Sequence, residues 1–291
     1  MEGRRKEISR LVKDVRTLPT LPGMVTRLNT LSDDPKATIQ EIARLISTDQ
    51  VLSAKVLKLV NSPFYGFSGR VSTVSNALIL LGVNVVRGLV LSSSIFEMME
   101  KNLIGLWEHS FGAAVAASVV ANRLKLSDAE EISTAALLHD IGKVIIKIKL
   151  GKEYDRLLGV VLENDRPMNE VESEQLDTDH AEIGEWLAKN WYLPPRLIEP
   201  IAFHHRVAQS SEYRVRTAAV HLADILVKAS GFGFSGDEFV QPIQPAAREA
   251  LGLTETALEG IVEEVEEKLV DAKNFSLQVQ SPQTAKGDEA R

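Results

Sequence analysis

The sequence contains no cysteine among its 291 residues. Disulfides and thiolate metal sites are therefore excluded, and any metal ion must be held by nitrogen and oxygen ligands. Long apolar runs are also absent, because no stretch reaches the roughly 18 uninterrupted apolar residues of a membrane-spanning helix. Residues 1–13 are too charged for a signal peptide. These absences predict a cytoplasmic protein that does not associate with a membrane.

The chain has no excess of positive charge either. Its 33 basic and 40 acidic residues give a formal net charge of -7. That balance disfavours the phosphate-tracking surface of a nucleic-acid-binding protein, so we expect no nucleic-acid partner. The proportions of hydrophobic (44%) and charged (25%) residues are those of an ordinary globular protein.

Helical periodicity dominates the first hundred residues. Thr38 and Glu41 form a predicted capping box, and apolar residues then recur at helical spacing through residues 39–60 and again through residues 74–81. Gly82 is predicted to end the second of these helical segments. No strictly alternating run, nucleotide-binding glycine loop or repeat of fixed period occurs. This half of the chain is predicted to be a small helical bundle.

Two turn-rich segments punctuate this half. Residues 18–23 (LPTLPG) cannot be helical throughout and are predicted to form a docking turn. The second segment, residues 63–70, contains Phe64, Tyr65 and Phe67. These aromatic side chains form either an exposed patch for a partner protein or plugs in the core.

The second half is predicted to be helical as well, up to a glycine-rich break at residues 231–236. Apolar residues between 258 and 269 mark a helix that packs on the core, whereas the polar composition after residue 276 is typical of a disordered tail. The chain is thus expected to divide into consecutive segments: an N-terminal segment 1–17, a helical subdomain 18–105, a second helical subdomain 106–230, a helical extension 231–275 and a tail 276–291.

All histidines lie after the first hundred residues, and their spacing places several of them on apolar faces. His109 and His180 each share a helical face with apolar residues, so both imidazoles should point inward. The doublet His139-Asp140 ends another apolar helical segment, and Asp224 interrupts an apolar face where an unpaired charge would be very costly. The full set of histidines is His109, His139, His180, His204, His205 and His221.

Each of these residues has a simpler interpretation on its own. A single inward histidine is usually a hydrogen-bonded core residue, and an aspartate near an apolar face is usually a helix cap or a surface residue. His221 keeps that simpler interpretation. The convergence of His-Asp and His-His doublets with further inward histidines and an aspartate instead predicts a site for transition-metal ions.

Residues 139–143 (HDIGK) resemble the signature of the HD superfamily of metal-dependent phosphohydrolases. The resemblance implies two metal ions that share Asp140 as a bridging ligand. The ligands implied for the first ion are His109, His139, Asp140 and Asp224. Those implied for the second ion are Asp140, His180, His204 and His205.

The first half resembles the helical region of HDOD proteins, the HD-related output domains of bacterial signalling. The resemblance is carried by residues 46–49 (ISTD), Leu52, Asn61-Ser62 and residues 76–82 (NALILLG), and it covers roughly residues 18–275. It implies an all-α fold in which an HDOD subdomain precedes an HD-type bundle. HDOD domains commonly have an eroded metal motif, so this chain departs from much of that family by retaining one.

Two further comparisons limit the expected chemistry. HD-GYP phosphodiesterases share the HDIGK motif and the His-His doublet, but here the doublet continues as Arg206–Gln209 without their Gly-Tyr-Pro element, which disfavours cyclic di-GMP as substrate. Gly105 stands four residues before His109, where a trinuclear relative supplies glutamate. We therefore expect one or two divalent transition-metal ions (iron, manganese, nickel or zinc).

The predicted function is a metal-dependent phosphohydrolase or phosphodiesterase that acts on a phosphoester or nucleotide, with Asp140 and Lys143 as its catalytic residues. Lys143 stabilises phosphoryl charge or protonates the leaving group, or else faces solvent. Arg206 binds substrate phosphate, or else is a surface residue. The alternative is a non-catalytic signalling output or scaffold module with a structural metal, whose HDOD half binds a regulatory protein.

Overall fold

The computed structural model describes residues 2–13, 27–28, 30–31, 37–62, 65 and 71–280. The turn predicted at residues 18–23, Phe64, Phe67 and residues 281–291 lie outside this part. Among the described residues the regular structure is helical, with no strand, so the all-α fold expected from the sequence is confirmed.

The helices of the first half are α1 (Glu2–Lys13), α3 (Ile39–Ser47), α4 (Gln50–Val60) and α5 (Val74–Asn102). The second half contains α6 (Leu106–Arg123), α7 (Ala129–Leu138), α8 (Ile141–Lys149), α9 (Gly151–Asn164), α10 (Met168–Leu176), α11 (His180–Asn190), α12 (Pro195–Phe203), the 3-10 helix η2 (Val207–Gln209), α13 (Arg214–Ala229), α14 (Pro245–Ala250) and α15 (Glu255–Gln280).

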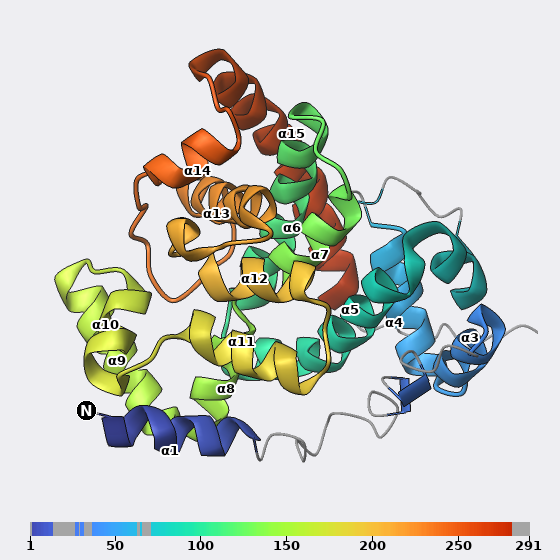
Figure 1. Ribbon diagram of the computed structural model, residues 1–291, viewed down its shortest axis with the longest axis horizontal. Helices are drawn as coiled ribbons and strands as arrows, with labels where there is room; N and C mark the ends of the chain where they lie inside the picture. Colours follow the sequence, from blue (N-terminus) through green and yellow to red (C-terminus); the bar gives the residue numbers. More distant parts are fainter. Residues whose placement is uncertain are drawn as a thin grey trace, which may run out of the picture.

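Helix α6 is the central element of the second half (Figure 1). It packs against α7, α13 and α15, and all of its residues from Ser110 to Ala121 are buried. A helix that is buried on every side can carry a polar residue only where a partner compensates for the lost water. His109 lies at the N-terminal end of this buried stretch, so it must find such partners inside the bundle.

The capping box predicted at the start of α3 is confirmed. The backbone N–H of Thr38 donates to Glu41 Oε2 at 2.8 Å, and the Glu41 N–H donates to Thr38 Oγ1 at 3.2 Å. Helices α3 and α4 pack on α5 and form the smaller lobe at the right of Figure 1.

Helix α5 connects the two lobes and turns sharply at Gly82. There the backbone adopts φ 78° and ψ 164°, a conformation that only glycine adopts readily. The sequence predicted that the helix ends at Gly82. In the structure the helix is interrupted at Gly82 and then continues to Asn102. Residues Val74–Ser93 are apolar and long enough to cross a membrane, but 61% of this stretch is buried within the protein. This burial is typical of a core helix.

Helix α1 was not expected from the charged N-terminal segment. Ile8 and Val12 on one face are buried, while Arg4 and Arg5 form ion pairs with Glu153 and Glu182. These contacts hold α1 along the lower edge in Figure 1, against α11. At the other end of the chain, α15 continues to Gln280, so the boundary expected at residue 276 falls inside a helix. Between Gly260 and Gln280 the sequence has no proline or glycine, and Pro282 is the next residue that would stop a helix.

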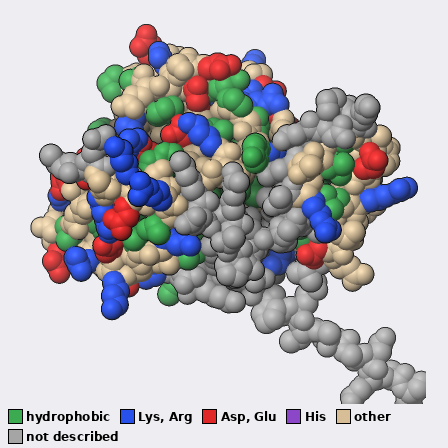
Figure 2. All heavy atoms as spheres, turned by 60° about the horizontal axis from the view of Figure 1, so that its bottom comes forward, with side chains coloured by type: hydrophobic (Ala, Val, Ile, Leu, Met, Phe, Trp, Pro, Cys, Tyr) green, Lys and Arg blue, Asp and Glu red, His purple; other side chains and the backbone are tan. Residues whose placement is uncertain are grey.

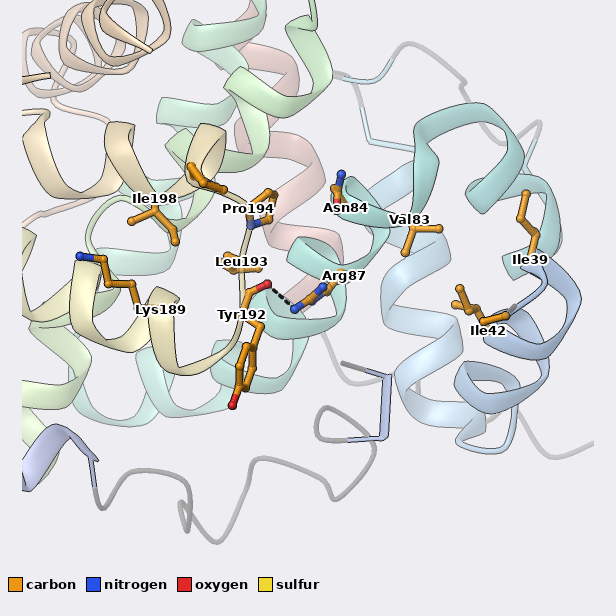
Figure 3. A pocket seen from close by; sticks show the side chains of 12 residues that line it. Ile39, Ile42, Val83, Asn84, Arg87, Lys189, Tyr192, Leu193, Pro194 and Ile198 are labelled. Carbon is orange, nitrogen blue, oxygen red and sulfur yellow. Dashed lines mark hydrogen bonds between the residues drawn. The ribbon is translucent and has the colours of Figure 1, made fainter. Parts of the chain in front are cut away.

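On the face shown in Figure 2, basic and acidic side chains are interspersed rather than gathered by sign. Between the lobes, a cavity of about 640 Å³ is walled by α3 and α5 on one side and by the α11–α12 connection on the other (Figure 3). Arg87 of α5 spans the two halves here, because its Nη2 donates to the carbonyl oxygen of Trp191 at 2.9 Å and also to that of Tyr192.

Gly82→Ala should lower the free energy of unfolding by about 1–3 kcal/mol, because alanine is strained at this positive φ. Added Cβ atoms meet no atom within 4 Å at Gly82 or at Gly159, and the latter lies in regular helix α9. Gly159→Ala is therefore a matched control that should stabilise the protein by about 0.5–1 kcal/mol. Urea denaturation followed by circular dichroism measures both, and equal effects of the same sign would contradict the role given to Gly82.

Candidate metal centre

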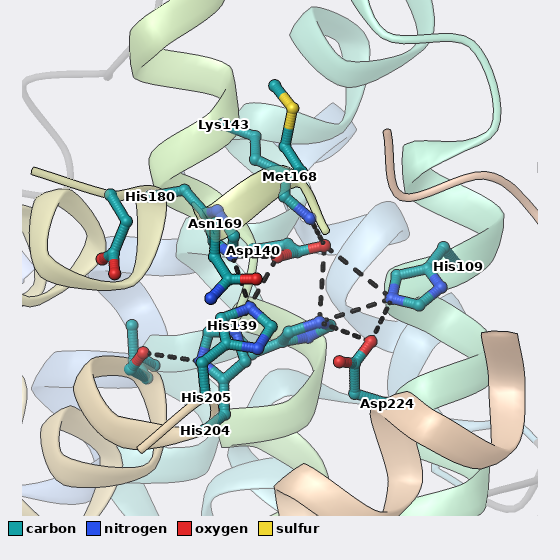
Figure 4. Close-up of polar contacts among 12 residues, drawn as sticks. His109, His139, Asp140, Lys143, Met168, Asn169, His180, His204, His205 and Asp224 are labelled. Carbon is teal, nitrogen blue, oxygen red and sulfur yellow. Dashed lines mark hydrogen bonds and ion pairs between the residues drawn. The ribbon is translucent and has the colours of Figure 1, made fainter. Parts of the chain in front are cut away.

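The structure brings all seven predicted metal ligands into one buried cluster (Figure 4). They come from distant parts of the chain, and none is more than 8% exposed. The ligands and their positions are His109 on α6, His139 at the end of α7, Asp140 immediately before α8, His180 at the start of α11, His204 and His205 after α12, and Asp224 on α13.

One part of the cluster surrounds Oδ2 of Asp140. The Nε2 atoms of His139 and His109 lie 3.4 and 3.7 Å from this oxygen. His109 Nε2 is also 3.0 Å from Asp224 Oδ1, and the two imidazole Nε2 atoms are 3.4 Å apart. Two ligands about 2.1 Å from one tetrahedral ion are separated by about 3.4 Å, so these spacings fit ligands that converge on a common ion.

The other part of the cluster faces Oδ1 of the same carboxylate. His180 Nε2 lies 3.2 Å from Asp140 Oδ1 and 3.0 Å from His205 Nε2. His204 Nε2 is 4.0 Å from Asp140 Oδ1. The two oxygens of Asp140 therefore face two different sets of side chains.

Several buried ligand atoms make no well-aligned hydrogen bond among the described residues, although His180 Nε2 lies 3.2 Å and His109 Nε2 3.0 Å from the two carboxylate oxygens among them. They are Asp140 Oδ1, Asp224 Oδ1 and His204 Nε2. A buried polar atom without a partner costs about 1–3 kcal/mol, whereas a bound cation would satisfy all three of these atoms at once. The donor set of imidazole nitrogens and carboxylate oxygens thus fits a divalent metal ion.

The close approach of α8 and α11 depends on Gly142. A Cβ atom at this position would lie 1.9 Å from the carbonyl oxygen of His180. Only a residue without a side chain lets the two helices come together here, and their contact places Asp140 beside His180.

Hydrogen bonds at the far side of the rings aim the Nε2 atoms into the cluster. His139 Nδ1 donates to the carbonyl oxygen of Ala136 at 2.6 Å, and His204 Nδ1 donates to that of Ile201 at 2.8 Å. These bonds hold the proton on Nδ1 and leave the Nε2 lone pair free for a metal.

The charge states of the cluster also suit metal ligands. Burial disfavours the ionised form of Asp140, but His139 and Lys143 outweigh it and hold the pKa of this carboxyl well below its usual range. For Asp224, burial is outweighed in the same way by Lys228 and His109, so its pKa is also well below normal. Burial and neighbouring imidazoles lower the pKa values of His204 and His205 well below their usual range. Two carboxylates are thus ionised and two imidazoles neutral.

His180 behaves differently because of Glu172, a residue that the sequence interpretation missed. Glu172 is completely buried, and its Oε2 accepts hydrogen bonds from His180 Nδ1 at 2.6 Å and from the His180 backbone N–H at 2.8 Å. Burial lowers the pKa of His180, but Glu172 and Asp140 outweigh it and raise this pKa to about 9. The signal for Glu172 was its helical spacing from Met168 and Leu176, which puts it on the buried face of α10.

Lys143 is buried rather than exposed to solvent. Its side chain is 1% exposed, and its Nζ donates to Asp140 Oδ2 at 2.8 Å. Arg206 lies outside the cluster and is 33% exposed. It binds Asp179, the N-cap of α11, and therefore contacts the residue that precedes His180.

A core role was expected for His221 and was left open for Tyr65. His221 is buried; its Nδ1 donates to the carbonyl oxygen of His204 at 2.7 Å, and its Nε2 accepts from the Gln244 N–H at 3.1 Å. Tyr65 is buried as well, with its hydroxyl 2.9 Å from Thr134 Oγ1. Both side chains are part of the core.

Comparisons with known proteins identify the family. Residues 18–207 match the HDOD domain. The chain belongs to the HDOD domain family. The HDOD match spans the junction between the two lobes and includes six of the seven clustered ligands, all except Asp224.

Relatives of this HDOD protein occur among known sequences and among solved structures. An uncharacterized protein of Treponema pallidum (strain Nichols) is 26% identical over 219 residues, which are 72% of this chain but only 42% of that protein. The chain thus spans less than half the length of this relative. Among solved structures, an HDOD domain protein of unknown function from Geobacter sulfurreducens is 28% identical with a TM-score of 0.69, over 92% of this chain and 97% of that one. A proposed phosphohydrolase from Shewanella amazonensis SB2B shares the fold at 23% identity and a TM-score of 0.63, over 91% of this chain and 97% of that one.

Glu172→Gln should weaken metal binding about 10- to 100-fold, because removing a charged partner of a ligating histidine usually costs that much. The control is Glu170→Gln on the exposed face of the same helix. Competition with a chromophoric chelator measures the affinity of both variants for Mn²⁺ or Zn²⁺. If both bind as tightly as the unmodified protein, Glu172 does not orient His180 for metal binding.

Proposed function

We propose that this HDOD protein is a phosphohydrolase or phosphodiesterase that uses two divalent transition-metal ions and acts on a phosphoester or nucleotide in the cytoplasm. The observation that carries the proposal is the position of Asp140 between two sets of ligands. His109, His139 and Asp224 would hold one ion with Oδ2, while His180, His204 and His205 would hold the other with Oδ1. Iron, manganese, nickel and zinc all suit such nitrogen and oxygen ligands.

A pair of such ions supplies Lewis acidity, which polarises a phosphoryl oxygen and lowers the pKa of a water molecule. The residues of the chain prepare the site for this chemistry. Lys143 keeps Asp140 ionised by a charge-assisted hydrogen bond. Burial opposes the charge on Lys143 itself, but Asp140, Asp237 and Glu172 outweigh it and raise its pKa. Lys143 therefore carries a fixed positive charge that would stabilise phosphoryl oxygens.

The likeness to the Shewanella protein supports this proposal through the fold that the two share. The intact ligand set supports it more directly, because a purely structural role would not require one carboxylate to face two groups of imidazoles. Arg206 binds the N-cap of the helix that presents His180, so we assign it a positioning role rather than contact with substrate.

The burial of the cluster favours a second function. Every ligand is at least 92% buried, and a metal enclosed on all sides is typical of a structural site. The protein would then be a signalling output module in which the metal stabilises the bundle and the HDOD half binds a regulatory protein.

Asp140→Asn should lose both metal ions together, because this residue contributes a ligand to each. Elemental analysis after anaerobic reconstitution with iron or manganese should find about two ions per chain in the unmodified protein and far fewer in the variant. Asp271→Asn, exposed on α15, is the control and should retain both ions.

Hydrolysis of bis(p-nitrophenyl) phosphate by the same preparations separates the two functions. The proposed enzyme predicts turnover that falls at least about 100-fold in Asp140→Asn. If the protein binds two metal ions but hydrolyses no phosphoester tested, the signalling module is the function that agrees with the result. A protein that stays free of metal after reconstitution would exclude the catalytic function.

A further inference from the structure

A non-helical segment, residues 231–244 between α13 and α14, lies against elements that surround the metal-ligand cluster. We call it the strap. It is attached to three elements that carry or flank ligands: α6, α10 and the His204-His205 segment. The attachments are the hydrogen bonds from Phe234 N to Gly105 O (2.9 Å), from Gln241 Nε2 to Asn169 Oδ1 (3.2 Å) and from Gln244 Nε2 to His205 O (2.6 Å).

At the centre of the strap, Asp237 points into the protein rather than into solvent. It is 4% exposed, and its Oδ2 accepts from the backbone N–H of Met168 at 3.2 Å. Its two oxygens lie 3.3 and 3.5 Å from Nζ of Lys228. A carboxylate of a surface connection is thus enclosed in a buried ion pair.

Lys228 connects this ion pair to the ligand cluster. Its side chain is 7% exposed, and its Nζ lies 3.8 Å from Oδ2 of Asp224, whose other oxygen faces His109. Lys143 contacts Asp140 elsewhere in the cluster. Two buried ammonium groups therefore lie against the two carboxylate ligands.

The charge balance changes when cations occupy the cluster. Without metal, Asp140 and Asp224 compensate Lys143 and Lys228. Two divalent cations would bring four positive charges against these two carboxylates, and the two lysines would then face only the carboxylates of Asp237 and Glu172, the latter already bonded to His180. Buried charges need compensation, so the loaded site would attract a further anion.

We propose that Lys228 binds a phosphate group of the substrate, and that Asp237 occupies this anion subsite whenever the strap is closed. A phosphorylated ligand then enters by displacing Asp237, and the strap opens as it does so. This inference rests on the proposed function, whose site it completes with a substrate-binding residue and a means of access.

The test compares Asp237→Asn with Glu238→Gln. Both remove one negative charge from adjacent strap positions, but Glu238 is exposed, and asparagine keeps the size of Asp237 and an oxygen that accepts from Met168. Isothermal titration of the metal-loaded protein with inorganic phosphate should show about tenfold tighter binding to Asp237→Asn than to Glu238→Gln, as expected when a competing charged contact is removed, whereas the metal-free protein should show a smaller gain. In the double variant with Lys228→Met this gain should disappear, whereas Lys152→Met, at an exposed position of α9, should preserve it.

A second measurement needs no variant. Hydrogen–deuterium exchange of the unmodified protein should show faster exchange of amides in residues 233–240 when phosphate is added at saturating concentration. Exchange that is unchanged by phosphate, equal phosphate affinities of the two strap variants, or a gain that survives Lys228→Met would each overturn the proposal. Neither measurement depends on turnover, so a strap that responds in a protein without hydrolase activity would separate this inference from the proposed function.

Discussion

The second half of this protein is organised around one buried carboxylate, that of Asp140. An ionised carboxylate in a protein interior is tolerated only where opposite charges and donors surround it, and breaking such an arrangement typically costs about 3–5 kcal/mol. Here Lys143 donates to one oxygen, and imidazoles from α6, α7 and α11 lie around both. If the helices that contribute these groups separated, a buried charge would be left without a partner. The same contacts therefore stabilise the bundle and shape the ligand cluster.

The inward direction of the ligands followed from the sequence because it depends on helical period alone. His109, His180 and Asp224 each share a helical face with apolar neighbours, and a residue on such a face must point into the core. The convergence of these residue types predicted a metal site, but the division of the ligands between two ions came from the resemblance to the HD superfamily, since periodicity cannot say which buried faces meet. Their meeting depends on tertiary contacts such as the one that Gly142 permits between α8 and α11.

Roles that depend on where a side chain points, rather than on whether it is buried, were harder to predict. Lys143 was left open between the site and solvent, because one helical turn after Asp140 is compatible with both. Arg206 adjoins the doublet in sequence, yet its guanidinium binds Asp179, a partner 27 residues away. Helix α1 was missed because its charged residues outnumber its apolar ones, although ion pairs to Glu153 and Glu182 make that face suitable for docking.

Helix α11 joins the metal-ligand cluster to the rest of the molecule. Its first residue is His180, its N-terminal turn binds α1 through Glu182, and the carbonyl oxygens of the two residues that follow its C-terminus accept from Arg87 of α5. A displacement of the HDOD lobe at the cavity beside Arg87 would act on this helix, and a movement of about 1 Å at a ligand is enough to disturb metal coordination. The two lobes are thus connected through one helix that begins with a residue of the ligand cluster. This connection is the same for the proposed enzyme and for the proposed signalling module.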